Sequence, residues 1–229
     1  VWNLGLVLGQ NEGRHYQTME DLLGGKSFHN INTYALGNYP ALSNAIHYDL
    51  NTAGPNRLGK LVYEGDRFGY DYRLTIHKGL VWSNYAVTTG RWHLIAAGKL
   101  GATDMQRYGY MRNGLFPENS YGRGRRAKFG EGGGKGAVTF DAGYGHVFKF
   151  GFGYEWRAPQ ATTAFMAPEM NNDFVSNLKN EHVLSSDISY QYQNAWLHAN
   201  LSGYYSRLDH VTEWQNFFFD DVNSFTYVS

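Results

Sequence analysis

The segment FKFGFGYEW, residues 148–156, places an aromatic side chain at every second position. Phe148, Phe150, Phe152, Tyr154 and Trp156 share one parity, whereas a lysine, a glutamate and two glycines share the other. A β-strand points successive side chains to opposite faces, so the segment predicts a strand with one aromatic face and one polar or bare face. Burying a large apolar side chain stabilises by about 1.5–3 kcal/mol. We therefore expect the aromatic face to lie against a protein core or against lipid.

The composition favours strands and turns. Charged residues make up 17% of the 229 residues and aromatic residues another 17%, whereas ordinary soluble domains are about 25% charged. Lys plus Arg and Asp plus Glu number 20 each, so the chain has no overall basic footprint for nucleic acid. There are 28 glycines, 5 prolines and no cysteine. No run of about 18 apolar residues occurs, which excludes a transmembrane helix but leaves the alternating strands of a membrane barrel open.

Period-2 alternation recurs along the chain. It predicts strands at 68–88, 91–111, 135–144, 148–156, 183–192 and 196–206, to which we add 1–9 and 223–229. In 183–192, for example, aliphatic and aromatic residues alternate with serine, aspartate and glutamine. The sequence therefore predicts an all-β protein of about eight antiparallel strands, each with one apolar and one polar face.

The connections between these strands alternate between short and long. Tight hairpin turns are predicted at 89–90, 144–146 and 194–195. Long connections are predicted at 10–67, 112–134, 158–182 and 216–222. An up-and-down meander with this pattern has all its short turns at one end and all its long loops at the other. Outer-membrane barrels are built in this way, with short periplasmic turns and long extracellular loops. We therefore expect a transmembrane β-barrel whose aromatics at 148–156 face lipid.

Three segments carry motifs beyond the alternation. YEWRAP (154–159) contains Arg157, Ala158 and Pro159 at the end of a predicted strand. It resembles the Arg-Ala-Pro that the TonB-dependent outer-membrane receptors often carry at the top of a barrel strand. NLKNEHVLSSDISYQYQNAWLHANLSGYYSRLDHV (177–211) resembles the loop, the strand ending in Tyr-x-Tyr and the hairpin into a Gly-Tyr-Tyr strand that follow. RYGYMRNGLFPENSYG (107–122) is similar to the corresponding loop of the large carrier-type members. The resemblance is diffuse over residues 68–229.

The resemblance implies uptake of a nutrient across the outer membrane of a Gram-negative bacterium, through a plugged barrel whose long extracellular loops capture the ligand. The implied partners are membrane lipid and lipopolysaccharide, the TonB complex acting through a plug, and a surface lipoprotein lid. The nutrient itself stays open. Residues 1–229 show about eight strands, no plug-like or TonB-box segment and a terminal Ser229 in place of an aromatic. We therefore expect a portion of one 22-stranded barrel domain. The alternative is a soluble or surface-anchored all-β binding module, such as an adhesin or a lectin.

No catalytic, cofactor or metal site is predicted. The nine histidines form no H-E-x-x-H or H-x-x-x-H pair, and the G-x-S-x-G motif of serine hydrolases is absent. We therefore do not expect an enzyme.

Two segments on predicted loops have alternative interpretations. YGRGRRAKFGEGGGKGA (121–137) contains a basic cluster, Arg123, Arg125, Arg126 and Lys128. This cluster is a candidate contact for an anionic ligand or a lipopolysaccharide phosphate, or else part of a solvated loop. FFFDDV (217–222) is either an extracellular contact or packing within a loop.

Overall fold

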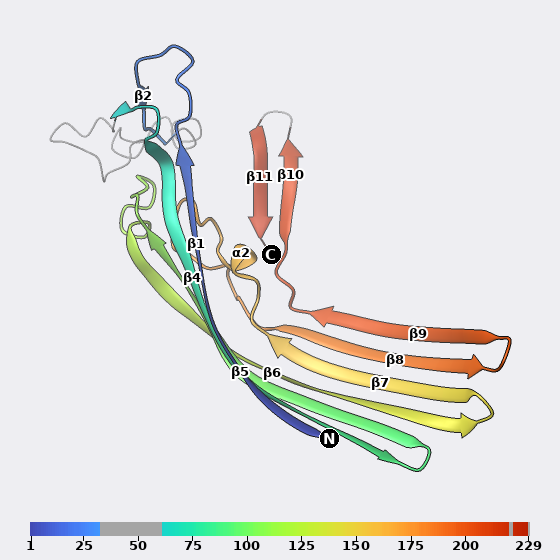
Figure 1. The fold of residues 1–229 in the computed structure, drawn as a ribbon. Coiled ribbons are helices and arrows are strands. Elements are labelled where there is room, and N and C mark those ends of the chain that lie inside the picture. Colours follow the sequence, from blue (N-terminus) through green and yellow to red (C-terminus); the bar gives the residue numbers. More distant parts are fainter. Residues whose placement is uncertain (33–60, 220–221, 229) are drawn as a thin grey trace.

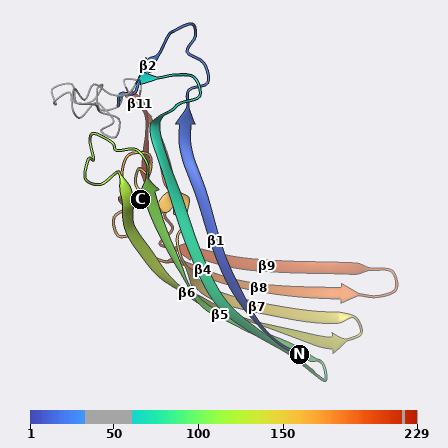
Figure 2. The same ribbon diagram turned by 60° about the vertical axis from the view of Figure 1, so that its left-hand side comes forward.

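A computed structural model describes residues 1–32, 61–219 and 222–228 (Figure 1). The protein is all-β, and most of it is one antiparallel sheet of seven strands in the order β1-β4-β5-β6-β7-β8-β9. The strands are β1 (Trp2–Thr18), β4 (Arg67–Thr89), β5 (Trp92–Gly109), β6 (Gly122–Gly143), β7 (His146–Arg157), β8 (Glu181–Gln193) and β9 (His198–Asp209). Figures 1 and 2 show a strongly curved wall with β1 and β9 at its two edges. Within the described residues these two edge strands do not pair with each other, so the sheet is not closed into a barrel.

Four short strands and one helical turn complete the described structure. β2 (Phe28–His29) pairs with β3 (Leu61–Val62), and β10 (Trp214–Phe219) pairs with β11 (Val222–Val228). The single turn α2 (Ala161–Ala164) lies in the connection between β7 and β8. Among the described residues, no helix is long and apolar enough to cross a membrane.

The long strands predicted from period-2 alternation are confirmed, but two of them are much longer than predicted. β1 continues to Thr18, and β6 begins at Gly122, so the predicted loop at 112–134 is wrong over most of its length. The glycine-rich part of that segment hid the strand, because glycine is depleted in strands. In the sheet these glycines leave room for neighbouring side chains. A Cβ at Gly132 would lie 2.4 Å from the indole of Trp156.

The chain end also differs from the prediction. The predicted loop at 216–222 overlaps β10 and β11, which form a hairpin apart from the main sheet. Residues 220–221 of that connection lie outside the described residues, as does much of the long connection after β1.

The alternation of short and long connections is confirmed within the seven-stranded sheet, but it does not continue from β9 to β10, which only residues 210–213 separate. β4 and β5 are joined by residues 90–91, β6 and β7 by Tyr144 and Gly145, and β8 and β9 by residues 194–197. Tyr144 and Gly145 have φ of 53° and 84°, the left-handed conformation of a tight hairpin turn. The last turn is longer than predicted, and the Asn194 side chain closes it by accepting hydrogen bonds from two backbone N–H groups. The three turns lie together at one end of the sheet, opposite the long connections (Figure 1).

The strand register gives the sheet two faces. Phe148 on β7 lies opposite Phe140 on β6 and Tyr190 on β8, and Phe140 lies opposite Trp92 on β5. We call the face that carries these residues the outer face. The concave inner face is covered near the long connections by α2 and its flanking residues (Figure 1). The main buried cluster is there, formed by Tyr72, Leu74, Met105, Phe129, Ala164 and Phe165.

Candidate functional site

The outer face carries an apolar band near the hairpin turns, exposed on β1, β4, β5, β7, β8 and β9 and half-buried on β6, where Val138 and Phe140 contribute. On β7, Phe148, Phe150, Phe152 and Tyr154 are 47%, 50%, 50% and 40% exposed. Other exposed members are Trp2, Leu4, Leu6, Leu8, Val81, Tyr85, Trp92, Leu94, Leu100, Ile188, Leu201 and Tyr205. On β7 the band runs from residue 148 to residue 156, which matches the length of about 9–11 residues that a tilted transmembrane strand needs. The parity predicted for this segment is thus confirmed, whereas its contact with lipid stays a prediction.

Aromatic rings with a polar atom lie toward both margins of this apolar band. At the hairpin end, the Tyr190 hydroxyl lies 2.7 Å from Nδ1 of His146. Toward the loop end, the Tyr154 hydroxyl contacts Nδ1 of His182, and the ring centroid of Trp156 lies 6.2 Å from that of Tyr154. Such amphipathic rings are enriched where a membrane meets water.

Polar residues replace the apolar band on the outer face as the strands approach the long connections. Gln10, His77, Asp104 and Lys128 lie side by side on β1, β4, β5 and β6 and form one cross-strand row. Nδ1 of His77 lies 3.1 Å from a carboxylate oxygen of Asp104. The outer face therefore changes from apolar to polar within a few residues along β1, β4, β5 and β6.

A buried carboxylate lies at the far margin of this polar region. The Asp71 carboxylate accepts hydrogen bonds of 2.8 and 2.7 Å from Arg14 on β1 and one of 2.8 Å from Arg67. Burial alone would raise the pKa of Asp71, but the two arginines outweigh it and lower the pKa below its ordinary value of 3.8. Asp71 therefore ties the loop end of β1 to β4.

The inner face mixes apolar side chains with polar ones and carries ion pairs between strands. Lys78 on β4 lies 2.9 Å from Glu131 on β6, and Lys99 on β5 lies 2.6 Å from Glu155 on β7. Each of these pairs reaches across an intervening strand. Arg157 then pairs with Glu181 on β8 at 2.9 Å.

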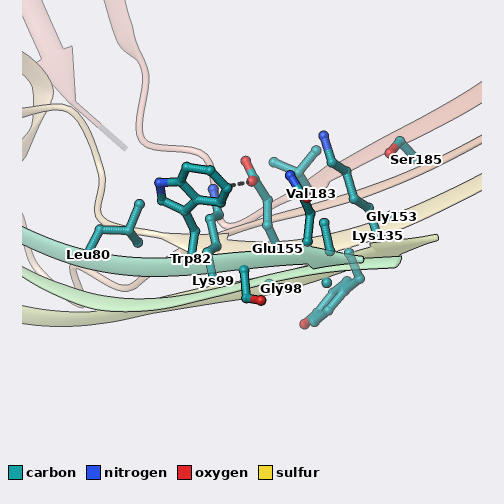
Figure 3. Close-up of a pocket in the computed structure, with 15 residues that line it drawn as sticks. Leu80, Trp82, Gly98, Lys99, Lys135, Gly153, Glu155, Val183 and Ser185 are labelled. Atoms are coloured by element: carbon teal, nitrogen blue, oxygen red, sulfur yellow. Dashed lines mark hydrogen bonds and ion pairs between the residues drawn. The ribbon is translucent and has the colours of Figure 1, made fainter. Parts of the chain in front are cut away.

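A hollow of about 500 Å³ lies on the inner face beside the Lys99–Glu155 pair. Its floor is rich in glycine, and Figure 3 shows Trp82, Glu155 and Lys135 projecting from the same side of the sheet. The Trp82 indole lies over Gly5 of β1, where an added Cβ would approach to 2.4 Å. The hollow thus combines an aromatic platform with charged groups and a floor of glycines.

Two long connections fold over the loop end of the inner face and are held by a buried arginine. Arg107 is 1% exposed. Its guanidinium donates to the carbonyl oxygens of Pro168 at 2.6 Å and Ser120 at 2.8 Å, and to Oδ1 of Asn172 at 2.6 Å. Burial lowers the pKa of Arg107 to about 10, which keeps it charged at neutral pH. Arg107 therefore fixes residues 110–121 and 158–180 as an inward shelf.

The structure changes the setting of the predicted basic cluster. Arg123, Arg125, Arg126 and Lys128 are exposed as expected, but they lie on strand β6 and not on a loop. Arg126 Nε lies 3.4 Å from Asp104, so this cation is partly neutralised. The side chains of 217–222 lie outside what the structure describes, so that prediction stays open.

No catalytic constellation stands out among the described residues. Ser176 and Lys179 have the S-x-x-K spacing of some nucleophilic enzymes, but both are exposed on a loop and no hydrogen bond joins them. Within the same described residues, no group of three or more His, Asp or Glu side chains is arranged to hold a metal ion.

Sequence reasoning missed Arg107 and the cross-strand ion pairs. No local motif marks them, because their partners come from strands and loops distant in the sequence.

Comparison with known proteins found no matching family model, no matching curated protein and no matching solved structure. The two faces of the sheet are therefore the features that bear on function.

Proposed function

We propose that this chain forms part of the wall of an outer-membrane transport barrel of the TonB-dependent receptor type. The observation that carries the proposal is the opposition of the two faces: an apolar band of membrane-spanning length outside and ion pairs, glycines and serines inside. A monomeric soluble protein rarely exposes a contiguous apolar patch of more than a few hundred Å². A sheet with lipid on one side and a water-filled lumen on the other accounts for both surfaces.

The edges of β1 and β9, which have no second partner strand among the described residues, support a wider barrel. In hydrocarbon, each N–H or C=O group without a hydrogen-bond partner costs several kcal/mol. We therefore propose that further strands pair with both edges and close a barrel large enough for a plugged lumen, as in 22-stranded transporters. The inward shelf held by Arg107 narrows that lumen at its loop end.

In this proposal the long connections face the cell exterior and capture a nutrient, which then passes along the inner face. Coupling to the TonB complex through a plug, and closure by a surface lipoprotein lid, follow from the family resemblance alone. The chemistry of the nutrient stays open, because the inner face offers both charges and an aromatic platform.

Membrane extraction tests the proposal. The full-length protein, including the strands that close the barrel, is expressed in a Gram-negative host, and outer membranes are washed with alkaline carbonate and then with detergent. We expect the protein to resist the wash, to be released by detergent and to migrate differently on gels before and after heating. Release by carbonate alone would contradict the proposal and favour the surface-bound adhesin or lectin alternative.

A further inference from the structure

A second hollow, of about 660 Å³, lies on the outer face where the apolar band meets the polar row. Its lining includes Leu8, Gln10, His77, Asp104 and Lys128. The hollow exists because the next cross-strand row is Leu8, Gly79, Ala102 and Gly130, in which only Leu8 has a large side chain. This row of small residues thus lies between the cations, which are nearer the long connections, and the exposed leucines and valine, which are nearer the hairpin turns.

The charges around this outer hollow are not balanced. Asp104 is contacted by both His77, at 3.1 Å, and Arg126, at 3.4 Å. Lys128 lies opposite Asp104 in the register, yet among the described residues it has no ion-pair partner, and its side chain is exposed. Arg126 already contacts the Asp104 carboxylate and Lys128 has no carboxylate of its own, so the hollow has an excess of positive charge.

We propose that this hollow binds the phosphorylated headgroup of an acylated glycolipid in the outer leaflet. The proposal rests on the proposed function, because it requires the apolar band to lie in the membrane. In that setting the acyl chains contact Leu6, Val81 and Leu100. The headgroup lies over Gly79 and Ala102, in the next cross-strand row toward the long connections. Lys128 Nζ then donates a charge-assisted hydrogen bond to a phosphate oxygen, and Arg126 adds a second cation.

The continuity of the hollow with the apolar band identifies the occupant as a lipid. A free phosphate ion would use only the cations and would leave the adjoining Leu8, which is 76% exposed, uncovered. A purely apolar ligand would leave Lys128 unneutralised. An anionic amphiphile satisfies both parts of the surface at once.

The test measures glycolipid retained by the full-length protein after purification from outer membranes in mild detergent. We compare wild type with Lys128→Ala, and with Lys149→Ala as a matched control, because Lys149 is exposed on the inner face of β7. Loss of one hydrogen bond between charged groups weakens binding by about tenfold or more. We expect Lys128→Ala to lose phosphorylated glycolipid to that extent and Lys149→Ala to retain it.

A second variant tests the shape of the hollow, and rebinding with two forms of the glycolipid tests the need for its phosphate. Ala102→Phe leaves every charge in place but fills the hollow, and it should lose the glycolipid as Lys128→Ala does. Rebinding should require the phosphorylated glycolipid and should fail with its dephosphorylated form. Equal binding of both forms, or displacement by millimolar inorganic phosphate, would overturn the lipid-phosphate site.

Alkaline extraction of the same samples separates this proposal from the proposed function. A wild-type protein that resists the wash but retains as much glycolipid as both variants would overturn the site alone. A wild-type protein released by the wash would overturn the proposed function and the site together.

Discussion

Lys99 on β5 and Glu155 on β7 form an ion pair of 2.6 Å above Gly133 of the intervening strand β6. The register places the three residues in one cross-strand row on the inner face. A Cβ on Gly133 would lie 2.7 Å from Cβ of Glu155 and 2.8 Å from the carbonyl oxygen of Tyr154. Gly133 therefore permits the contact between side chains on non-adjacent strands.

Replacing Gly133 with valine should break this pair. The added side chain displaces Glu155 and the β7 backbone, and such overpacking costs about 1–3 kcal/mol. We expect a lower unfolding temperature for Gly133→Val in detergent, measured by heat-dependent gel migration. Gly130→Ala on the same strand is the control, because an added Cβ there meets nothing within 4 Å. An equal effect of both variants would indicate general strand weakening in place of a specific clash.

Lipid contact of the outer face should follow the parity of β7. A spin label at Phe150 should show high accessibility to oxygen, and a label at Lys149 should show accessibility to an aqueous quencher. Gly151 is a poor label site although it shares the inner face, because an added Cβ would lie 2.3 Å from the Asp187 carboxylate. Aqueous accessibility at both positions would contradict a membrane-embedded band.

The sequence alone predicts the long strands and the two faces, because both depend on the period-2 alternation of residues such as Phe148 and Phe150. It does not predict where glycine-rich strands begin. β6 starts at Gly122 because its first half pairs with β5, where Gly122 lies opposite Gly109, and local propensity carries no record of such a partner strand. The same limit applies to the basic cluster. Its composition is visible in the sequence, but the pairing of Arg126 with Asp104 depends on the register between β5 and β6.

The two ends of the sheet should label differently on intact cells. The chain contains no cysteine, so single cysteines give a clean background. Glu118 is exposed between β5 and β6, and Trp196 is 83% exposed between β8 and β9. We expect Glu118→Cys to react with a membrane-impermeant maleimide on whole cells, and Trp196→Cys to react only after lysis. The reverse pattern would invert the proposed sidedness.

The inward shelf should depend on Arg107. Arg107→Met keeps much of the side-chain volume but removes the donors to Pro168, Ser120 and Asn172. A hydrogen bond to a charged group contributes about 1.5–3 kcal/mol, so the loss should release the shelf. Limited proteolysis should then cut within 158–180 faster than in wild type. Arg125→Met, an exposed arginine of β6, is the control, and equal cleavage of both variants would exclude a specific role for Arg107.

Acid should loosen the loop end of β1 through Asp71. Arg14 and Arg67 hold its pKa below the ordinary value of 3.8, so near that pH the folded protein binds fewer protons at Asp71 than the unfolded chain does. The stabilisation is therefore complete above about pH 4 and is lost as the pH falls through the lowered pKa. The rate of hydrogen exchange of amides near Arg14 should rise at low pH by more than the pH dependence of exchange in an unstructured peptide predicts.

Asp71→Asn should show the raised exchange already at neutral pH. Asp209→Asn removes a more exposed ion pair with Arg207 and should leave exchange near Arg14 unchanged. If exchange in Asp71→Asn stayed at the wild-type level at neutral pH, the carboxylate would not be what ties β1 to β4.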